Sequence, residues 1–135
     1  MLSSRGTMTT ILVVEDDAFL RDIFQRVLER AGFHVLTAAH GKEALASFHG
    51  GGIGLVLTDL MMPELDGFEL IRALKLEAPA IPVIAVSVMN DMSNCRDRVV
   101  ALGAELAMCK PVDPRELVRL VQQLTASPVG SASLQ

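Results

Sequence analysis

Residues 55–67 read LVLTDLMMPELDG, and the organisation of the whole chain follows from them. Residues 55–58 are apolar or β-branched without alternation, which is typical of a strand buried on both faces of a parallel sheet. Asp59 stands where this strand ends, so the strand delivers one carboxylate to the edge of the sheet. Pro63 belongs to the loop that follows, and Asp66-Gly67 leads into a helix. A lone aspartate at a strand end is ordinary turn chemistry, but other polar residues stand at the ends of the other predicted strands.

The composition indicates one folded domain. The chain has 135 residues, of which 50% are hydrophobic, and this is enough for a single core. No window approaches the ~20 consecutive apolar residues of a membrane span, and the first residues lack the apolar region of a signal peptide. We expect a disordered lead over residues 1–8, one domain over 9–125 and a disordered tail over 126–135.

Charge, cysteines and aromatic residues argue against several classes of function. A net charge of -4 disfavours a nucleic-acid surface, which needs clustered Lys and Arg. The chain has no Trp or Tyr, so a stacking platform for single-stranded nucleic acid is not expected. Cys95 and Cys109 have no paired spacing, which disfavours a structural zinc site and fits a reducing cytoplasm. We therefore expect a cytoplasmic protein without membrane insertion or direct binding of nucleic acid.

Five apolar runs alternate with five helical patterns. Strands are predicted at 11–14, 33–38, 55–58, 83–86 and 104–108, and helices at 20–31, 41–48, 68–74, 91–102 and 114–124. In the first helix the apolar stripe faces the core, and Arg21 is among the polar residues on the other side. Such alternation indicates parallel strands with helices on both faces. We expect an α/β fold: a single doubly wound (βα)5 domain with a flavodoxin-like sheet of strand order 2-1-3-4-5.

Three acidic residues are predicted to meet at one edge of this sheet. Glu15 and Asp16 directly follow the first strand, and Asp59 ends the third. In open α/β sheets, ligands bind outside the carboxyl ends of the strands where the strand order reverses, and these two strands are neighbours there. Crowded carboxylates stay ionised only around a cation, and oxygen ligands favour Mg²⁺ or Mn²⁺. A backbone carbonyl just after Asp59 is a natural further ligand, because the side chains there are apolar.

Two more polar residues end the fourth and fifth predicted strands. These residues are Ser87 and Lys110. An ionised aspartate is a nucleophile toward phosphorus, and the charge of the transferred group needs a cation opposite, which suits Lys110. Ser87 offers a hydroxyl to a phosphate oxygen. The sequence therefore predicts that Asp59 accepts a phosphoryl group.

In these residues the chain resembles the receiver domain of two-component response regulators. The matching pieces are Ile11–Asp17, Asp59–Gly67, Pro82–Ser87 and Gly103-Ala104 followed by Lys110-Pro111. Each piece alone is a modest signal. Together, in order and in register, they are specific and cover roughly residues 10–125.

The resemblance implies a role for each residue of the site. Asp59 resembles the phosphoacceptor and Lys110 the phosphate-binding lysine. Ser87 resembles the hydroxyl that moves toward the phosphate. The implied ligands of the metal are Asp16 directly, Glu15 through water, Asp59, and the backbone carbonyl of Met61. The family also implies a cis peptide bond between Lys110 and Pro111.

The resemblance implies partners as well. A phosphohistidine on a sensor histidine kinase or on a histidine phosphotransfer protein would donate the phosphoryl group, and the aspartyl phosphate would be lost slowly, without turnover of a substrate. A single-domain regulator of this kind would act on a downstream protein partner, or form a phosphorylation-linked dimer. The surface that changes would comprise the helix 91–102, the strand 104–108 and the last helix.

Two alternatives stay open. The family usually has Tyr or Phe three residues before the lysine, where this chain has Ala107, so one alternative is a degenerate receiver that acts as a scaffold without phosphorylation. The other is a phosphohydrolase with an aspartate nucleophile. Such an enzyme needs a second aspartate two residues after the nucleophile, where Met61 stands.

Overall fold

Strands and helices alternate strictly in the computed structural model, which describes residues 9–61, 66–88 and 92–126, without the side chains of residues 92–95. The predicted lead over 1–8 and the predicted tail beyond residue 126 lie outside these ranges, and so does Pro63. The order is β1 (Thr10–Val14), α1 (Ala18–Arg30), β2 (His34–Ala38), α2 (Gly41–His49), β3 (Ile53–Asp59), α3 (Gly67–Glu77), β4 (Val83–Val88), α4 (Met92–Ala101), β5 (Leu106–Lys110) and α5 (Pro114–Thr125).

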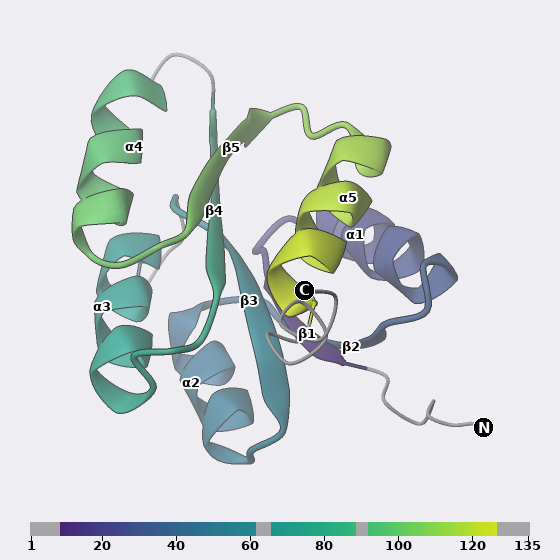
Figure 1. Ribbon diagram of the computed structural model, residues 1–135, viewed down its shortest axis with the longest axis horizontal. Helices are drawn as coiled ribbons and strands as arrows, with labels where there is room; N and C mark the ends of the chain where they lie inside the picture. The colour runs from purple at the N-terminus through teal and green to yellow at the C-terminus, as the bar shows by residue number, and fades with distance from the viewer. Residues whose placement is uncertain (1–8, 62–65, 89–91, 127–135) are drawn as a thin grey trace, which may run out of the picture.

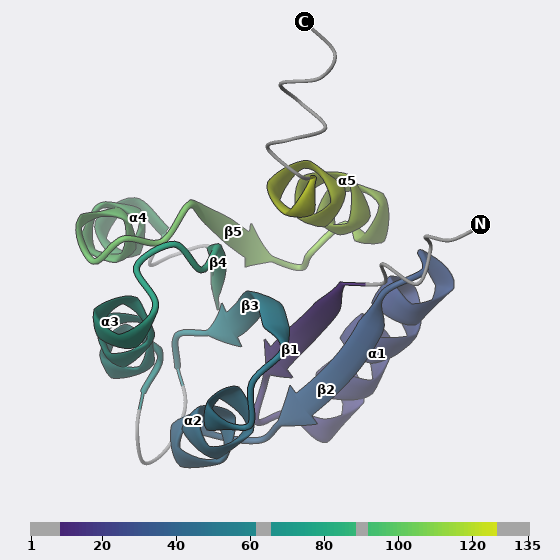
Figure 2. The same cartoon turned by 60° about the horizontal axis from the view of Figure 1, so that its bottom comes forward.

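The strands form one parallel sheet in the order β2-β1-β3-β4-β5. Helices α1 and α5 lie on one face of this sheet, and α2, α3 and α4 lie on the other (Figure 1). The turned view shows the same two layers of helices with the sheet between them (Figure 2). The predicted doubly wound α/β fold and its strand order are confirmed.

Strand β1 shows why the strands read as continuous apolar runs. Its side chains alternate between two hydrophobic cores: Ile11 and Val13 belong to the cluster that includes residues of α1 and α5. Leu12 and Val14 belong to the cluster that includes residues of α2, α3 and α4. All four are at most 1% exposed. A strand covered on both faces has no solvent-exposed side, so its residues are apolar until the strand reaches the edge of the sheet.

The second strand begins one residue later than the sequence predicts. Gly32 has a φ of 101°, the left-handed conformation that commonly ends a helix. Phe33, which was expected to open the strand, donates its N–H to the carbonyl of Leu28 in α1 at 3.1 Å. Because this N–H completes the end of the helix, pairing of β2 with β1 starts at His34.

The fifth strand is present but lies two residues later than the predicted 104–108, for the same reason. Gly103 has a φ of 110°. The N–H of Ala104 bonds to the carbonyl of Val99 in α4 at 2.9 Å, so this residue belongs to the helix end rather than to the sheet. Strand β5 runs from Leu106 to Lys110, which makes Lys110 the last residue of the strand itself.

Candidate functional site

Strand register brings the acidic residues and the lysine to one edge of the sheet. Val14 of β1 is paired with Thr58 of β3. Glu15 and Asp59 each lie one residue beyond that pair, so they leave the sheet side by side. Lys110 ends β5 at the same edge, since all strands are parallel. The carboxyl ends of β1, β3 and β5 therefore supply one site, as the topology predicts.

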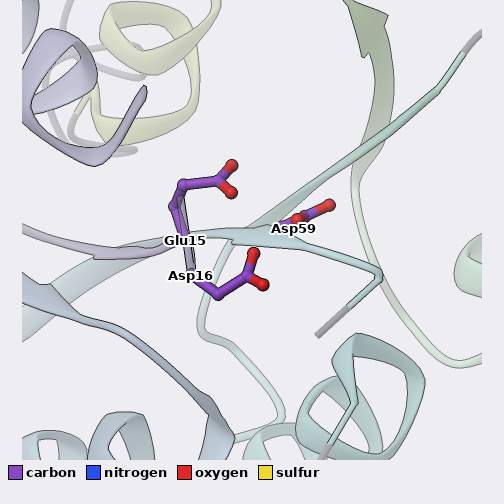
Figure 3. A group of neighbouring side chains, drawn as sticks. All are labelled: Glu15, Asp16 and Asp59. Atoms are coloured by element: carbon purple, nitrogen blue, oxygen red, sulfur yellow. The ribbon is translucent and has the colours of Figure 1, made fainter. Parts of the chain in front are cut away.

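Three carboxylates lie together at this edge (Figure 3). Glu15, Asp16 and Asp59 each place one carboxylate oxygen within 4.8 Å of the other two. Glu15 is 1% exposed and Asp59 is 5% exposed, whereas Asp16 is open to solvent. We call these three residues the acidic cluster. The predicted convergence of β1 and β3 carboxylates is thus present in the structure.

Lys110 provides the positive charge opposite these carboxylates. Its Nζ lies 3.2 Å from Oε1 of Glu15 and 3.4 Å from Oδ2 of Asp59. The contact with Glu15 is an ion pair without hydrogen-bond geometry, because Oε1 has no hydrogen-bond partner among the described residues. The Lys110-Pro111 bond is cis, as expected. One ammonium therefore faces two buried carboxylates, which leaves the cluster with an excess of negative charge.

Burial and mutual repulsion affect protonation at this site. The pKa of the Glu15 carboxyl is raised from 4.5 to about 7, first by burial and then by the charge of Asp59. The N–H of Asp17 and the ammonium of Lys110 offset part of that rise. Burial lowers the pKa of Lys110, but Asp59 and Glu15 together raise it by more, so the net pKa lies above 10.5. Glu15 is therefore poorly stabilised as an anion unless a cation joins it.

The backbone around Asp59 is held tightly. The N–H of Met61 donates to Oδ1 of Asp59 at 3.3 Å, and the hydroxyl of Thr58 donates to the Asp59 carbonyl at 2.9 Å. Gly67, the first residue of α3, packs directly on this segment: a Cβ at this position would overlap the Asp59 carbonyl and Cα of Leu60. The predicted Asp-Gly step therefore lets α3 begin against the strand end, with Asp66 as its N-cap.

Ser87 is buried on β4, the strand next to β3, which carries Asp59. It is 1% exposed, and its Oγ has no hydrogen-bond partner among the described residues. Buried hydroxyls are nearly always paired, so an unpaired one marks a position with unused hydrogen-bonding capacity. The role of Ser87 toward a phosphate and the role of the Met61 carbonyl toward a metal stay predictions. The side chain of Met61 is 60% exposed.

The acidic cluster suits a hard divalent cation. Its donors are oxygens only, and Oε1 of buried Glu15 has no hydrogen-bond partner among the described residues. Mg²⁺ and Mn²⁺ prefer such ligands, and a bound cation would remove the repulsion that raises the pKa of Glu15. Glu15, Asp16 and Asp59 therefore fit the expected ion by their chemistry.

Arg21 is a residue of this region whose position the sequence analysis missed. Periodicity places it on the polar side of α1, but its side chain is half-buried. Its Nη1 donates to the carbonyl of Glu15 at 2.8 Å. The only signal in the sequence is an arginine one turn into a helix that begins beside acidic residues, and this signal is weak.

Ala107 lies where an aromatic residue was expected from the resemblance. It is half-buried on β5, paired with Ala85 of β4, and packs against the core under α2, α3 and α4. A methyl group at this position cannot exchange between a buried and an exposed rotamer as an aromatic ring can.

Comparisons with known proteins agree with this geometry. Residues 11–122 match the model of the family described as "Response regulator receiver domain". The "Uncharacterized 14.6 kDa protein in sodA1 3'region" of Leptolyngbya boryana is 41% identical over 115 residues, which are 84% of this chain and 87% of that protein. "Probable transcriptional regulator ycf27" of Porphyridium aerugineum is 39% identical over 107 residues, 79% of this chain and 44% of that protein.

Solved structures are similar over most of the chain. The chemotaxis protein CheY4 of Vibrio cholerae is 28% identical and superposes with a TM-score of 0.81 over 87% of this chain and 99% of that chain. By contrast, the chain spans about half the length of the ycf27 regulators that it matches. None of the helices in the described ranges has the length and apolar character that crossing a membrane requires.

Proposed function

The chain belongs to the family of response regulator receiver domains, and we propose that Asp59 is its phosphoacceptor. The observation that carries the proposal is the pairing of Asp59 with Lys110 inside a cluster of three carboxylates. This arrangement combines a nucleophile, a fixed cation and oxygen ligands for a second cation. These components suit phosphoryl transfer, because its catalysis consists mainly of positioning and charge stabilisation.

In the proposed reaction, a carboxylate oxygen of Asp59 attacks the phosphorus of a phosphohistidine on a sensor histidine kinase or a phosphotransfer protein. The new oxygen–phosphorus bond forms while the phosphorus–nitrogen bond breaks, and the imidazole nitrogen keeps the electron pair and takes a proton. Bound Mg²⁺ or Mn²⁺ supplies neutralisation of charge on the phosphoryl oxygens. Glu15, Asp16, Asp59 and the Met61 carbonyl would hold this ion.

Lys110 and Ser87 are proposed to bind the phosphoryl group after transfer. Lys110 Nζ is 3.4 Å from Asp59 Oδ2, so it is within reach of an oxygen on a phosphorus attached there. The unpaired hydroxyl of Ser87 would donate to another phosphoryl oxygen and thereby gain the partner it lacks. The movement of Ser87 toward the phosphate would alter the surface of α4, β5 and α5.

We further propose that output passes through another protein that binds this α4–β5–α5 surface, or through a phosphorylation-linked dimer. Support comes from one relative of similar length, the Leptolyngbya boryana protein, of which the match covers 87%. A scaffold that works without phosphorylation is the second candidate, favoured by Ala107 alone. Hydrolysis of phosphate esters has no support, because position 61 is a methionine with an exposed side chain.

The test is metal-dependent phosphorylation by a small donor. The protein is incubated with acetyl phosphate and Mg²⁺, and its intact mass is measured. We expect a gain of one phosphoryl group, none when EDTA replaces Mg²⁺, and none in Asp59→Asn. Asp66→Asn is the matched control, because it changes a nearby carboxyl that caps α3 and should still be labelled. Labelling that survives in Asp59→Asn, or no labelling of the wild type at any Mg²⁺ concentration, would refute the assignment.

A further inference from the structure

Arg21 is tied to the segment that carries two of the three acidic residues. Its backbone N–H donates to the carbonyl of Asp17 at 2.9 Å in the first turn of α1. Its guanidinium turns back toward the sheet, and Nη1 donates to the carbonyl of Glu15 at 2.8 Å. The side chain of Asp17 also caps α1, with Oδ1 accepting from Phe19 and Leu20. Hydrogen bonds therefore hold the β1–α1 connection both where it begins, at Glu15, and where it ends, at Asp17.

The peptide groups on both sides of Asp16 are held by these bonds. The Glu15–Asp16 peptide is held at its carbonyl by Arg21. The Asp16–Asp17 peptide is held at its N–H by Oε2 of Glu15, at 3.1 Å. Among the described residues, no hydrogen bond holds the carboxylate of Asp16 itself. The described hydrogen bonds that position Asp16 therefore act on its backbone, and the Arg21 bond is one of the two that hold its neighbouring peptide groups.

We infer that Arg21 is a positioning residue for the divalent cation: by fixing the Glu15–Asp16 peptide, it keeps the Asp16 carboxylate directed toward Asp59. This inference rests on the proposed function, because it concerns the metal site of that reaction. Partners that orient metal ligands without touching the metal typically change metal affinity by 10–100-fold when they are removed. Arg21 contacts a backbone carbonyl and not a carboxylate, so its orienting effect would operate through the backbone.

Electrostatics and positioning predict opposite results here. A guanidinium near a cation site repels the cation, so loss of its charge alone would strengthen cation binding by a few-fold at short range in a partly solvated site. Loss of the hydrogen bond to the Glu15 carbonyl would instead free the peptide and weaken binding. The direction of the change in affinity therefore separates a positioning role from a simple effect of charge.

The experiment measures Mn²⁺ binding to the full chain by electron paramagnetic resonance of the free ion, with Mg²⁺ affinity from competition. We expect Arg21→Met to bind Mn²⁺ about 10-fold more weakly than the wild type. Arg21→Lys keeps the positive charge but lacks the planar guanidinium. It should bind Mn²⁺ at least about three-fold more weakly than the wild type does. Arg26→Met removes the same charge one turn later, from an exposed pair with Asp22, and should bind as the wild type does.

A second readout separates binding of the ion from the reaction itself. With acetyl phosphate as donor, the Mg²⁺ concentration for half-maximal phosphorylation should rise about 10-fold in Arg21→Met, while the rate at saturating Mg²⁺ stays within about two-fold. If Arg21→Met is unfolded by circular dichroism, Arg21→Lys decides the question. Equal or tighter Mn²⁺ binding by the folded variant overturns the inference. Absence of Mn²⁺ binding by the wild type would instead overturn the metal site of the proposed function.

Discussion

Glu15 is the side chain for which burial has the largest chemical consequence. It is 1% exposed, accepts one backbone N–H, and faces both the negative charge of Asp59 and the ammonium of Lys110. Burial first, and then Asp59, raises its pKa from 4.5 to about 7. A carboxylate in this position reduces the stability of the cation-free protein at neutral pH. The same unfavourable charge makes the site attractive to a divalent cation.

The pH dependence of stability follows from that pKa. Because the folded-state pKa of about 7 exceeds 4.5, the folded protein binds the extra proton between these values. Without a divalent cation, this contribution to the free energy of unfolding is therefore lost as pH rises from about 4.5 to about 7. Glu15→Gln removes the effect, so its stability relative to the wild type should increase over this range by at most about 3.5 kcal/mol, at roughly 1.4 kcal/mol per pKa unit.

Urea denaturation in EDTA at pH 5 and pH 8 measures this difference. Comparing the variant with the wild type at each pH cancels the other titrating groups. Glu29→Gln, an exposed residue of α1, is the control and should keep a constant difference from the wild type. A Glu15→Gln variant that gains nothing between the two values would show that Glu15 is ionised in the folded protein at both.

Position along the strands was enough to identify the charged groups of the site from sequence, whereas the role of Arg21 was not visible. Asp59 and Lys110 end strands, and the ends of parallel strands must meet. Periodicity gives only the direction in which a side chain leaves a helix. A long arginine side chain on the polar side of a helix can fold back to a carbonyl of the preceding loop. Whether it does so depends on three-dimensional contacts, which the spacing of residues in the sequence does not reveal.

Few of the described side chains of helix α4 pack against the rest of the domain. Val99 is fully buried and Leu102, just beyond the helix, is half-buried. The guanidinium of Arg98 stacks over the ring of Phe68 in α3, with its carbon 3.8 Å from the ring centroid. Phe68 directly follows Gly67, which packs on the carbonyl of Asp59. The stacked pair therefore connects α4 to α3, the helix whose first residue packs on the proposed phosphoacceptor.

Loss of this pair should loosen α4. A cation–π contact at an exposed site contributes about 0.5–1 kcal/mol, which corresponds to roughly a two- to five-fold change in a local opening equilibrium. We expect amide hydrogen exchange in α4 of Arg98→Met to accelerate by about that factor, with β1 and β3 unchanged. Arg96→Met removes an exposed arginine from the same helix and is the control. Equal acceleration in both variants would assign the effect to helix propensity or charge rather than to stacking.

The ends of the elements show where reasoning from sequence stops. Gly32 and Gly103 both have positive φ, as glycines just beyond a helix often do. Phe33 and Ala104 follow them and look suited to a strand, yet each donates its N–H back to the preceding helix. Which of two partners an N–H takes is settled by three-dimensional geometry, so the strands β2 and β5 were predicted as elements but their first residues were not.

At the opposite end of the molecule from the site, the sheet is fixed by a polar network. Lys75 of α3 donates to the carbonyl of Ile81 and pairs with Glu105 at 3.2 Å. Glu105 in turn accepts the N–H of Val83, the first residue of β4, at 2.8 Å. These contacts join the carboxyl end of α3 to the amino ends of β4 and β5. A change at the carboxyl ends of β4 and β5 should therefore be expressed near the site and α4, while the amino ends stay in place.

Lys110 is where this whole-molecule argument can be tested. It is the last residue of β5 and contacts Glu15 and Asp59. A phosphoryl group on Asp59 would therefore bond to the end of a strand that belongs to the proposed output surface. In Lys110→Ala, acetyl phosphate with Mg²⁺ should still label Asp59, because attachment needs the nucleophile and the ion. In the wild type, this phosphoryl group should change amide hydrogen exchange in α4, β5 and α5. In Lys110→Ala these changes should be lost, because the end of β5 is no longer bonded to the phosphate. Lys110→Arg, which keeps the charge, should retain part of them. If Lys110→Ala responds to phosphorylation as fully as the wild type does, the signal leaves the site by another route, and the hydroxyl of Ser87 on β4 becomes the residue to test.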